Sequence, residues 1–200
     1  MLKLDETIVQ EYFEYNGFLV KALRKACPQA KRSLADEGAS LYVKNSNFVS
    51  GGRDPAFTIF SSELRYMDSA IICVRGWHED KAALATMTDG AEVAKYVETK
   101  ISKKISKWFP QDVLESIGIK EAPMKILVAP VFPMHEQYRR EIERVLREHG
   151  IDAILSFKSL LVDLIEHVNT KEVYPKSESL QLIRMLKTFD LVKSSQMNFG

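Results

Sequence analysis

The chain has 200 residues, of which 46% are hydrophobic and 28% are charged. This composition excludes a disordered chain and is typical of a globular protein that buries a sizeable core in a single domain, here residues 1–200. Lys and Arg number 28 against 27 Asp and Glu. The overall charge therefore indicates no polyanionic partner, and a nucleic-acid surface has to come from local clustering.

Cysteine usage and hydropathy indicate the compartment. The two cysteines, Cys27 and Cys73, are too few for a disulfide framework and are typical of a reducing compartment. No apolar run approaches the roughly 20 residues that span a bilayer. Acidic residues stand near the N-terminus, where a signal peptide is basic and then apolar. We therefore expect a cytoplasmic protein that does not enter a membrane.

The first part of the chain is predicted to form a helix and then short strands. Apolar residues between Leu4 and Phe13 recur on one helical face, and Asn16-Gly17 provides a stop. Residues 17–23 read as a strand, and residues 41–43 as a weaker one. Residues 45–55 are rich in Asn, Ser and Gly, which predicts a loop.

A buried strand is predicted to follow, and it ends at residues that could bind a ligand. Residues 57–60 and 64–67 are interpreted as an extended or hairpin segment that leads into it. Residues 69–74 form a short, nearly continuous apolar run, which is typical of a strand buried on both faces. Open α/β sheets place ligands at the carboxyl ends of such strands. The residues at that end are Arg75, Gly76, Trp77 and His78.

A helix with a basic stripe is predicted over residues 93–108. Its apolar positions are Tyr96, Val97, Ile101, Ile105 and Trp108. Its lysines recur at the i, i+3, i+4, i+7 spacing that places them along one helical face. These lysines are Lys100, Lys103, Lys104 and Lys107. The stripe is either a solvated helix face or a surface that contacts phosphates.

The second half of the chain alternates strands and helices. Residues 126–133 and 151–157 are predicted strands, and the helix between them ends at Gly150. This order is a βαβ unit, which implies parallel strands. Two further helices are predicted to pack on the same domain, around residues 160–168 and 182–189. We expect a three-layer α/β/α fold with a mixed central sheet.

Several familiar catalytic motifs are absent from the sequence. There is no phosphate-binding GxxxxGK[ST] or GxGxxG loop and no GxSxG elbow. The four histidines show no HExxH spacing, and neither cysteine has a second cysteine nearby. The residues thus predict no zinc site and no resident cofactor.

The order of these segments resembles the PD-(D/E)XK, or restriction-endonuclease-like, superfamily. The resemblance rests on a first helix, the strand Gly17-Phe18-Leu19-Val20, the Gly51-Gly52 loop and the run Val74-Arg75-Gly76-Trp77. Residues 126–157 and the final helix are similar to the layout that follows this core. The resemblance implies a restriction-endonuclease-like fold and a nuclease that uses Mg²⁺.

Transferring the family motif residue by residue shows how this chain departs from it. The metal-binding acid of the family falls on Cys73, and the family lysine falls on Arg75. The first acid, which follows a proline, falls on Ala56 or less neatly on Asp54. Mg²⁺ prefers carboxylate oxygens, so a thiol is a poor substitute. An arginine binds phosphate bidentately, yet it does not release a proton as a lysine can.

Other acids are candidates for the missing ligands. Glu11 or Glu14 on the first helix matches the helical acid that some members of the superfamily use. Glu63 and Asp68 stand close to the predicted central strand, and relocated site residues are known in this superfamily.

Three functions follow as alternatives. The first is a nuclease-fold protein that binds nucleic acid or a partner with little or no catalysis, through the lysine stripe, Trp77 and His78. The second is an active Mg²⁺-dependent nuclease that uses Arg75 with nearby acids. The third is a non-enzymatic assembly module that forms a homo-oligomer through its apolar C-terminal helices.

Overall fold

The computed structural model describes residues 4–23, 38–48, 53–75, 90–109, 118, 122–130 and 136–192, without the side chains at positions 90, 93 and 100. Within this part of the chain the strands form one mixed sheet in the order β1-β2-β4-β5-β6-β3. The strands are β1 (Phe18–Ala22), β2 (Leu41–Asn45), β3 (Thr58–Ile59), β4 (Ser69–Val74), β5 (Met124–Ala129) and β6 (Ala153–Ser156).

The sheet has an antiparallel half and a parallel half that meet at β4. β1 pairs with β2, and β2 with β4, in antiparallel register. β4 pairs with β5, β5 with β6, and β6 with the edge strand β3 in parallel register. The parallel pairing of β5 and β6 around an intervening helix confirms the predicted βαβ unit, and β4 lies inside the sheet.

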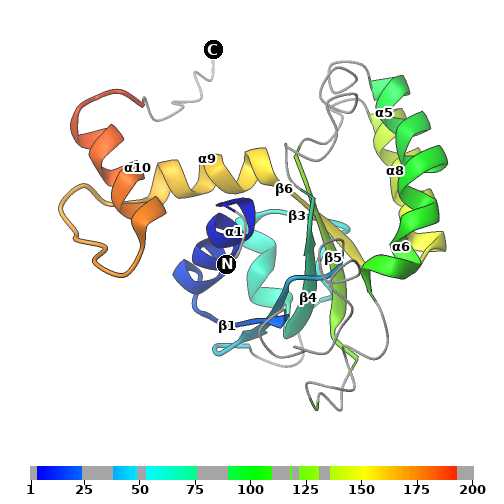
Figure 1. Cartoon of the computed structure of the whole chain (residues 1–200), viewed down its shortest axis with the longest axis horizontal. Coiled ribbons are helices and arrows are strands. Elements are labelled where there is room, and N and C mark those ends of the chain that lie inside the picture. Colours follow the sequence, from blue (N-terminus) through cyan, green and yellow to red (C-terminus); the bar gives the residue numbers. More distant parts are fainter. Residues whose placement is uncertain are drawn as a thin grey trace.

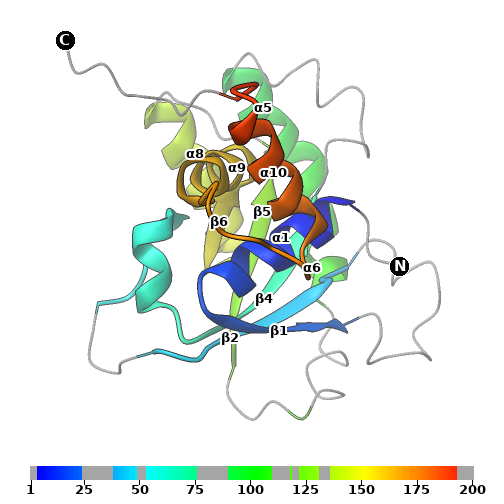
Figure 2. The same ribbon diagram turned by 90° about the vertical axis from the view of Figure 1, so that its left-hand side faces the viewer.

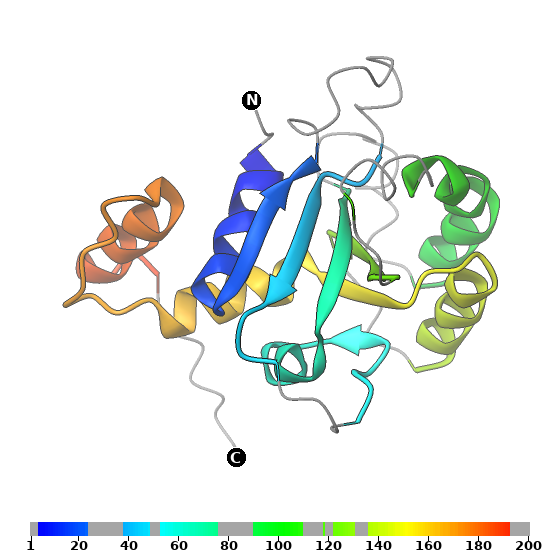
Figure 3. The same cartoon turned by 90° about the horizontal axis from the view of Figure 1, so that it is seen from below.

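Helices cover both faces of the sheet and give three layers (Figure 1). The helices are α1 (Leu4–Tyr15), η1 (Ser61–Tyr66), α5 (Gly90–Tyr96), η2 (Val97–Ile101), α6 (Ser102–Trp108), α8 (Glu136–Glu148), α9 (Phe157–His167) and α10 (Glu178–Thr188). α1, α9 and α10 lie in front of the sheet in Figure 2. Seen from below, the sheet separates them from α5, α6 and α8 (Figure 3). The predicted α/β architecture with a mixed sheet is confirmed.

Two hydrophobic cores fill the spaces between the three layers. Ile72 and Val74 of β4 contribute to the core under α1 and α9. Ile71 and Cys73 contribute to the core under α6 and α8. Every residue of β4 is buried, because alternate side chains of a strand point to opposite faces and both faces are covered. The sequence of this strand is a continuous apolar run because both of its faces are buried.

The first helix ends where the sequence predicted. Gly17 adopts a φ of 82°, a conformation that side chains rarely tolerate. A Cβ at this position would come within 3.2 Å of the Asn47 side chain. The chain therefore reverses at Gly17, and β1 joins the edge of the sheet beside β2.

The segment before β4 differs from its prediction. Residues 64–67 were expected to be extended or part of a hairpin, but η1 is a 3₁₀ helix over Ser61–Tyr66. Leu64 and Met67 are both buried and stand three residues apart. This spacing is one turn of a 3₁₀ helix, and the Met67 N–H donates to the Leu64 carbonyl.

The predicted helix over residues 93–108 also has an irregular part. It consists of α5, the π-helical segment η2 and α6, all continuous in the chain.

No helix within the described ranges has the length and apolar character that crossing a bilayer requires.

Candidate nucleic-acid interface

Arg75 follows β4 directly and lies at the carboxyl end of this internal strand. Its backbone N–H donates to the Val128 carbonyl of β5 at 2.9 Å, which extends the parallel pairing one residue past β4. Its guanidinium carbon lies 4.4 Å from the centroid of the Trp108 ring. A cation–π contact of this kind contributes roughly 0.5–2 kcal/mol. Arg75 is thus positioned by its own strand and by a helix from another part of the chain.

Trp108 connects α6 to this end of the sheet. It is the last residue of α6 and is almost fully buried. Its carbonyl accepts a hydrogen bond from the Ala39 N–H at 2.6 Å, just before β2. Sequence reasoning assigned Trp108 to the core and missed its contact with Arg75, because no local signal relates residues so distant in the chain.

The lysines of α6 are exposed beside Trp108. Lys103, Lys104 and Lys107 are exposed, and none of them forms an ion pair with another described residue. Lys104 precedes Trp108 by four residues, so these two side chains are neighbours on the helix surface. Since Trp108 contacts Arg75, the lysines of α6 and the Arg75 guanidinium lie around the same tryptophan.

The neighbouring helix α8 distributes its charges differently. Three of its four arginines form i,i+4 ion pairs on their own helix. The pairs are Arg140–Glu136 at 2.6 Å, Arg144–Glu148 at 2.8 Å and Arg147–Glu143 at 2.9 Å. Carboxylates thus neutralise much of the charge of α8, whereas α6 has no acidic residue of its own.

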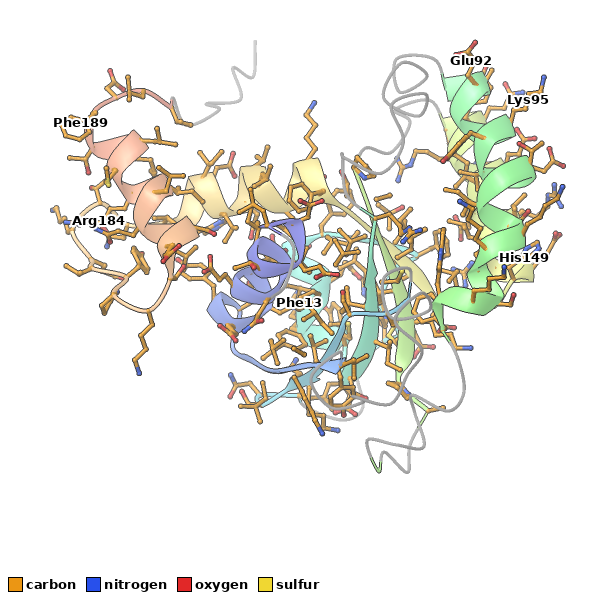
Figure 4. The ribbon with its side chains drawn as sticks, viewed as in Figure 1. Phe13, Glu92, Lys95, His149, Arg184 and Phe189 are labelled. Carbon is orange, nitrogen blue, oxygen red and sulfur yellow. The ribbon has the colours of Figure 1, made fainter. Side chains whose placement is uncertain are left out.

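Sequence reasoning also missed Lys95, which lies on α5 one segment before α6. Lys95 is exposed, and Figure 4 shows it on the outer side of the helix, near Glu92. It forms no ion pair within the part of the chain that the structure describes. It extends the basic surface of α6 towards the start of α5.

Some predicted binding residues lie outside the described part. Trp77 and His78 belong to this group, as does the side chain of Lys100. The surface is therefore built from Arg75, Trp108 and the exposed lysines Lys103, Lys104 and Lys107, which we call the α6 basic surface.

The predicted acids do not meet Arg75. Asp68 stands immediately before β4, and Arg75 stands immediately after it. Arg75 stands seven positions after Asp68, which corresponds to about 23 Å along the strand, since a strand rises roughly 3.3 Å per residue. The Asp68 carboxylate is instead paired with the Lys44 ammonium at 2.7 Å.

Glu63 holds a loop at the same distant end of β4. One carboxylate oxygen accepts from the Arg53 guanidinium, and the other accepts from the Ala56 N–H at 3.1 Å. Glu63 is buried, whereas Asp54 in the loop that it holds is exposed. The position of Glu63 is explained by this structural role.

Glu11 lies on the other side of the sheet from Arg75. It belongs to α1, whose apolar residues pack in the first core, whereas Trp108 packs in the second. Its Oε2 atom is buried without a hydrogen-bond partner. Glu14 is exposed and accepts a hydrogen bond from the Gln10 amide at 2.8 Å.

The residues present do not suit Mg²⁺ at Arg75. The Cys73 side chain is fully buried, and a thiol is a poor ligand for a hard cation. Across the described ranges, no group of three or more His, Cys, Asp or Glu residues is arranged to hold a metal ion. Because a guanidinium does not deprotonate in proteins, Arg75 is suited to binding an anion and not to acid–base chemistry.

No family model matches this chain, and no curated protein and no solved structure matches it either.

Proposed function

We propose that this chain is a nuclease-fold protein that binds nucleic acid through the α6 basic surface, with little or no catalysis. The observation that carries the proposal is the set of exposed lysines without carboxylate partners on the helix whose last residue stacks on Arg75. The positive charge is local, because the chain as a whole has a formal net charge of only +1.

The physical basis of binding is electrostatic. Lysines that neutralise phosphates release condensed counterions, and this release favours association most strongly at low salt. A guanidinium adds a planar fork that matches two phosphate oxygens. Trp108 orients the guanidinium of Arg75 through the stacking contact and thereby lowers the cost of ordering it on binding.

The separation of the acids supports weak or absent catalysis. Metal-assisted phosphodiester cleavage needs carboxylates close to the bound phosphate. Asp68 and Glu63 lie towards the opposite end of β4 and are already engaged with Lys44 and Arg53. A Mg²⁺-dependent nuclease is the less favoured alternative for this reason.

The order of elements supports the nuclease-like part of the proposal. α1 is followed by β1 and β2, then by β3, η1 and β4, and then by helices that alternate with the parallel strands β5 and β6. β1, β2 and β4 form the antiparallel part of the sheet. This arrangement is compatible with the resemblance to the PD-(D/E)XK superfamily that the sequence suggested.

A charge-matched pair of variants tests the proposal. We expect K103Q/K107Q to weaken binding to a labelled DNA duplex about tenfold at low salt, and to reduce the salt slope by about 0.9 per lysine. The control, K171Q/K176Q, removes the same charge from exposed lysines between α9 and α10, so its affinity should stay near that of the wild type. Fluorescence anisotropy over a salt series measures both quantities.

With Mg²⁺ or Mn²⁺ added, the bound duplex should remain intact.

Two results would contradict the proposal. If the wild-type chain fails to bind duplex or single-stranded nucleic acid at low salt, the surface has another role. Equal losses in the two double variants would show that net charge matters and the α6 basic surface does not.

A further inference from the structure

Helix α10 has one buried apolar side and one exposed apolar side. Leu180 and Ile183 pack into the first core. On the other side, Leu182, Met185 and Phe189 are 55%, 47% and 68% exposed. Their spacing of three and four residues aligns them in a single row, which we call the α10 stripe. Val173 before the helix and Leu191 after it are also exposed.

The charged side chains in the second half of α10 point away from the stripe. The Arg184 guanidinium donates to the Thr170 carbonyl at 3.0 Å. The Lys187 ammonium donates to the Val168 carbonyl at 2.7 Å. Both interactions attach α10 to the end of α9 and the loop that follows it. The apolar row is therefore not interrupted by charge.

A groove lies beside the first half of the stripe. It has a volume of about 440 Å³, and its walls are mostly apolar. Leu182 and Met185 form one side, and Val173, Tyr174 and Pro175 form part of the other. Phe189 directly follows the last residue of α10 and stands seven residues beyond Leu182, or about 10 Å at the rise of an α-helix. One surface thus carries both an apolar projection and an apolar recess.

We infer that the α10 stripe binds a second copy of this chain through a two-fold antiparallel helix pair. An interface with two-fold symmetry brings the same patch of both copies together, so it requires a surface that is complementary to itself. With the axis between Met185 and Leu186, Phe189 of each copy faces Leu182 and the adjacent groove of the other copy. The two helix dipoles then run in opposite directions, which is favourable.

The amount of apolar surface agrees with a modest dimer. The stripe and the groove walls offer on the order of 500 Å² per copy, against about 800 Å² per partner in a standard interface. A patch of this size lies within the range of about 300–600 Å² for the largest apolar patch of a typical monomer, and such patches are often functional. We expect a dissociation constant on the order of micromolar.

The dimer would leave the proposed nucleic-acid surface accessible. α10 and α6 lie on opposite sides of the sheet, at opposite ends of the molecule in Figure 1. Figure 4 shows Arg184 and Phe189 far from the α5 residues Glu92 and Lys95. The pairing of α10 is therefore independent of the proposed function and can be tested separately.

The first experiment measures the mass of the full chain by sedimentation as its concentration rises. We expect wild-type chains to pass from monomer to dimer, and L182K or F189E to raise the dissociation constant at least tenfold. L19E is the matched control, because Leu19 on β1 is 67% exposed and lies outside the stripe. Each variant should retain the melting temperature of the wild-type monomer, since the replaced side chains are exposed.

The second experiment mixes the two variants and tests the register. In a mixed dimer the lysine of L182K faces the glutamate of F189E, and the other contact keeps the wild-type pair Phe189 and Leu182. Neither variant alone can form either contact, so the mixture should dimerise at a concentration at which each component alone is monomeric. A wild-type chain that is monomeric at every concentration would overturn the inference. So would variants that dimerise like the wild type, or a mixture that remains monomeric.

Discussion

Arg75 has its position because two elements from different parts of the chain fix it. Its backbone continues the pairing of β4 with β5, and its guanidinium stacks on Trp108. Glu63 is a second residue with a defined structural role, because its carboxylate holds the Arg53–Ala56 loop. The Arg75 guanidinium contacts Trp108 at the end of β4, whereas the Glu63 carboxylate is engaged with a loop near the start of the same strand.

Tyr12 gives a prediction about alkaline stability. Burial raises the pKa of Tyr12 above its ordinary value, and the Asp163 carboxylate raises this pKa further. The folded state keeps the phenol proton at pH values where the unfolded chain has lost it. The contribution of this group to stability is complete below about pH 10 and is lost as the pH rises further, by about 1.4 kcal/mol per pH unit.

The variant Tyr12→Phe isolates this effect. We expect its free energy of unfolding to fall less steeply than that of the wild type above pH 10, because it has no phenol proton to lose. Urea unfolding at several pH values measures the difference. Parallel curves for the two chains across this range would contradict the prediction.

At the scale of elements, serine side chains cap the N-termini of α9 and α10. The Ser156 hydroxyl accepts from the Ser159 N–H, and the Ser177 hydroxyl accepts from the Leu180 N–H at 3.0 Å. Ser177 matters more for the proposed interface, because it fixes where α10 begins and therefore which side chains form the stripe. On the opposite face of the sheet, the π-helical segment η2 directly precedes α6 and its lysines.

Removal of the cap tests the role of Ser177. We expect Ser177→Ala to reduce the free energy of unfolding by about 1 kcal/mol, because one N–H at the helix start loses its acceptor. Hydrogen exchange should accelerate over the first turn of α10 before any other described helix is affected. Ser179→Ala, two residues later in the same turn, is the control and should have little effect. Equal destabilisation by both changes would show that the cap is not the cause.

At the scale of the whole molecule, the sheet separates two surfaces with different chemistry. The α6 basic surface lies on one side, and the apolar α10 stripe lies on the other (Figure 1). β4 belongs to both cores through its alternating side chains. Its packing therefore supports both surfaces at once.

Truncation inside β4 tests this shared support. Ile72 is fully buried, so Ile72→Ala should reduce the free energy of unfolding by about 2–5 kcal/mol through the lost transfer energy and the cavity left behind. Leu19→Ala on β1 should change it by less than about 0.5 kcal/mol, because Leu19 is exposed. Chemical denaturation of the two variants measures the contrast, and similar losses would argue against a central role for β4.

The sequence by itself determined the class of the fold and the order of most elements. Hydrophobic periodicity reports on which side of an element is buried, and this pattern is local to each helix or strand. It placed β4 as a buried strand, predicted the βαβ unit of β5 and β6, and located α6 with its lysines on one face. The sequence also predicted helix ends at Gly17 and Gly150, because glycine tolerates a positive φ. Both glycines adopt a positive φ in the structure.

The tertiary structure alone decided which of these residues meet. β3 precedes β4 in the chain yet pairs with β6 at the far edge of the sheet, and the buried pair Leu64 and Met67 selects a 3₁₀ turn over a hairpin. The same long-range packing brings Trp108 to Arg75 and leaves Asp68 and Glu63 near the other end of the strand. Contacts between distant segments depend on how whole elements pack, and a local pattern of residues does not encode that arrangement.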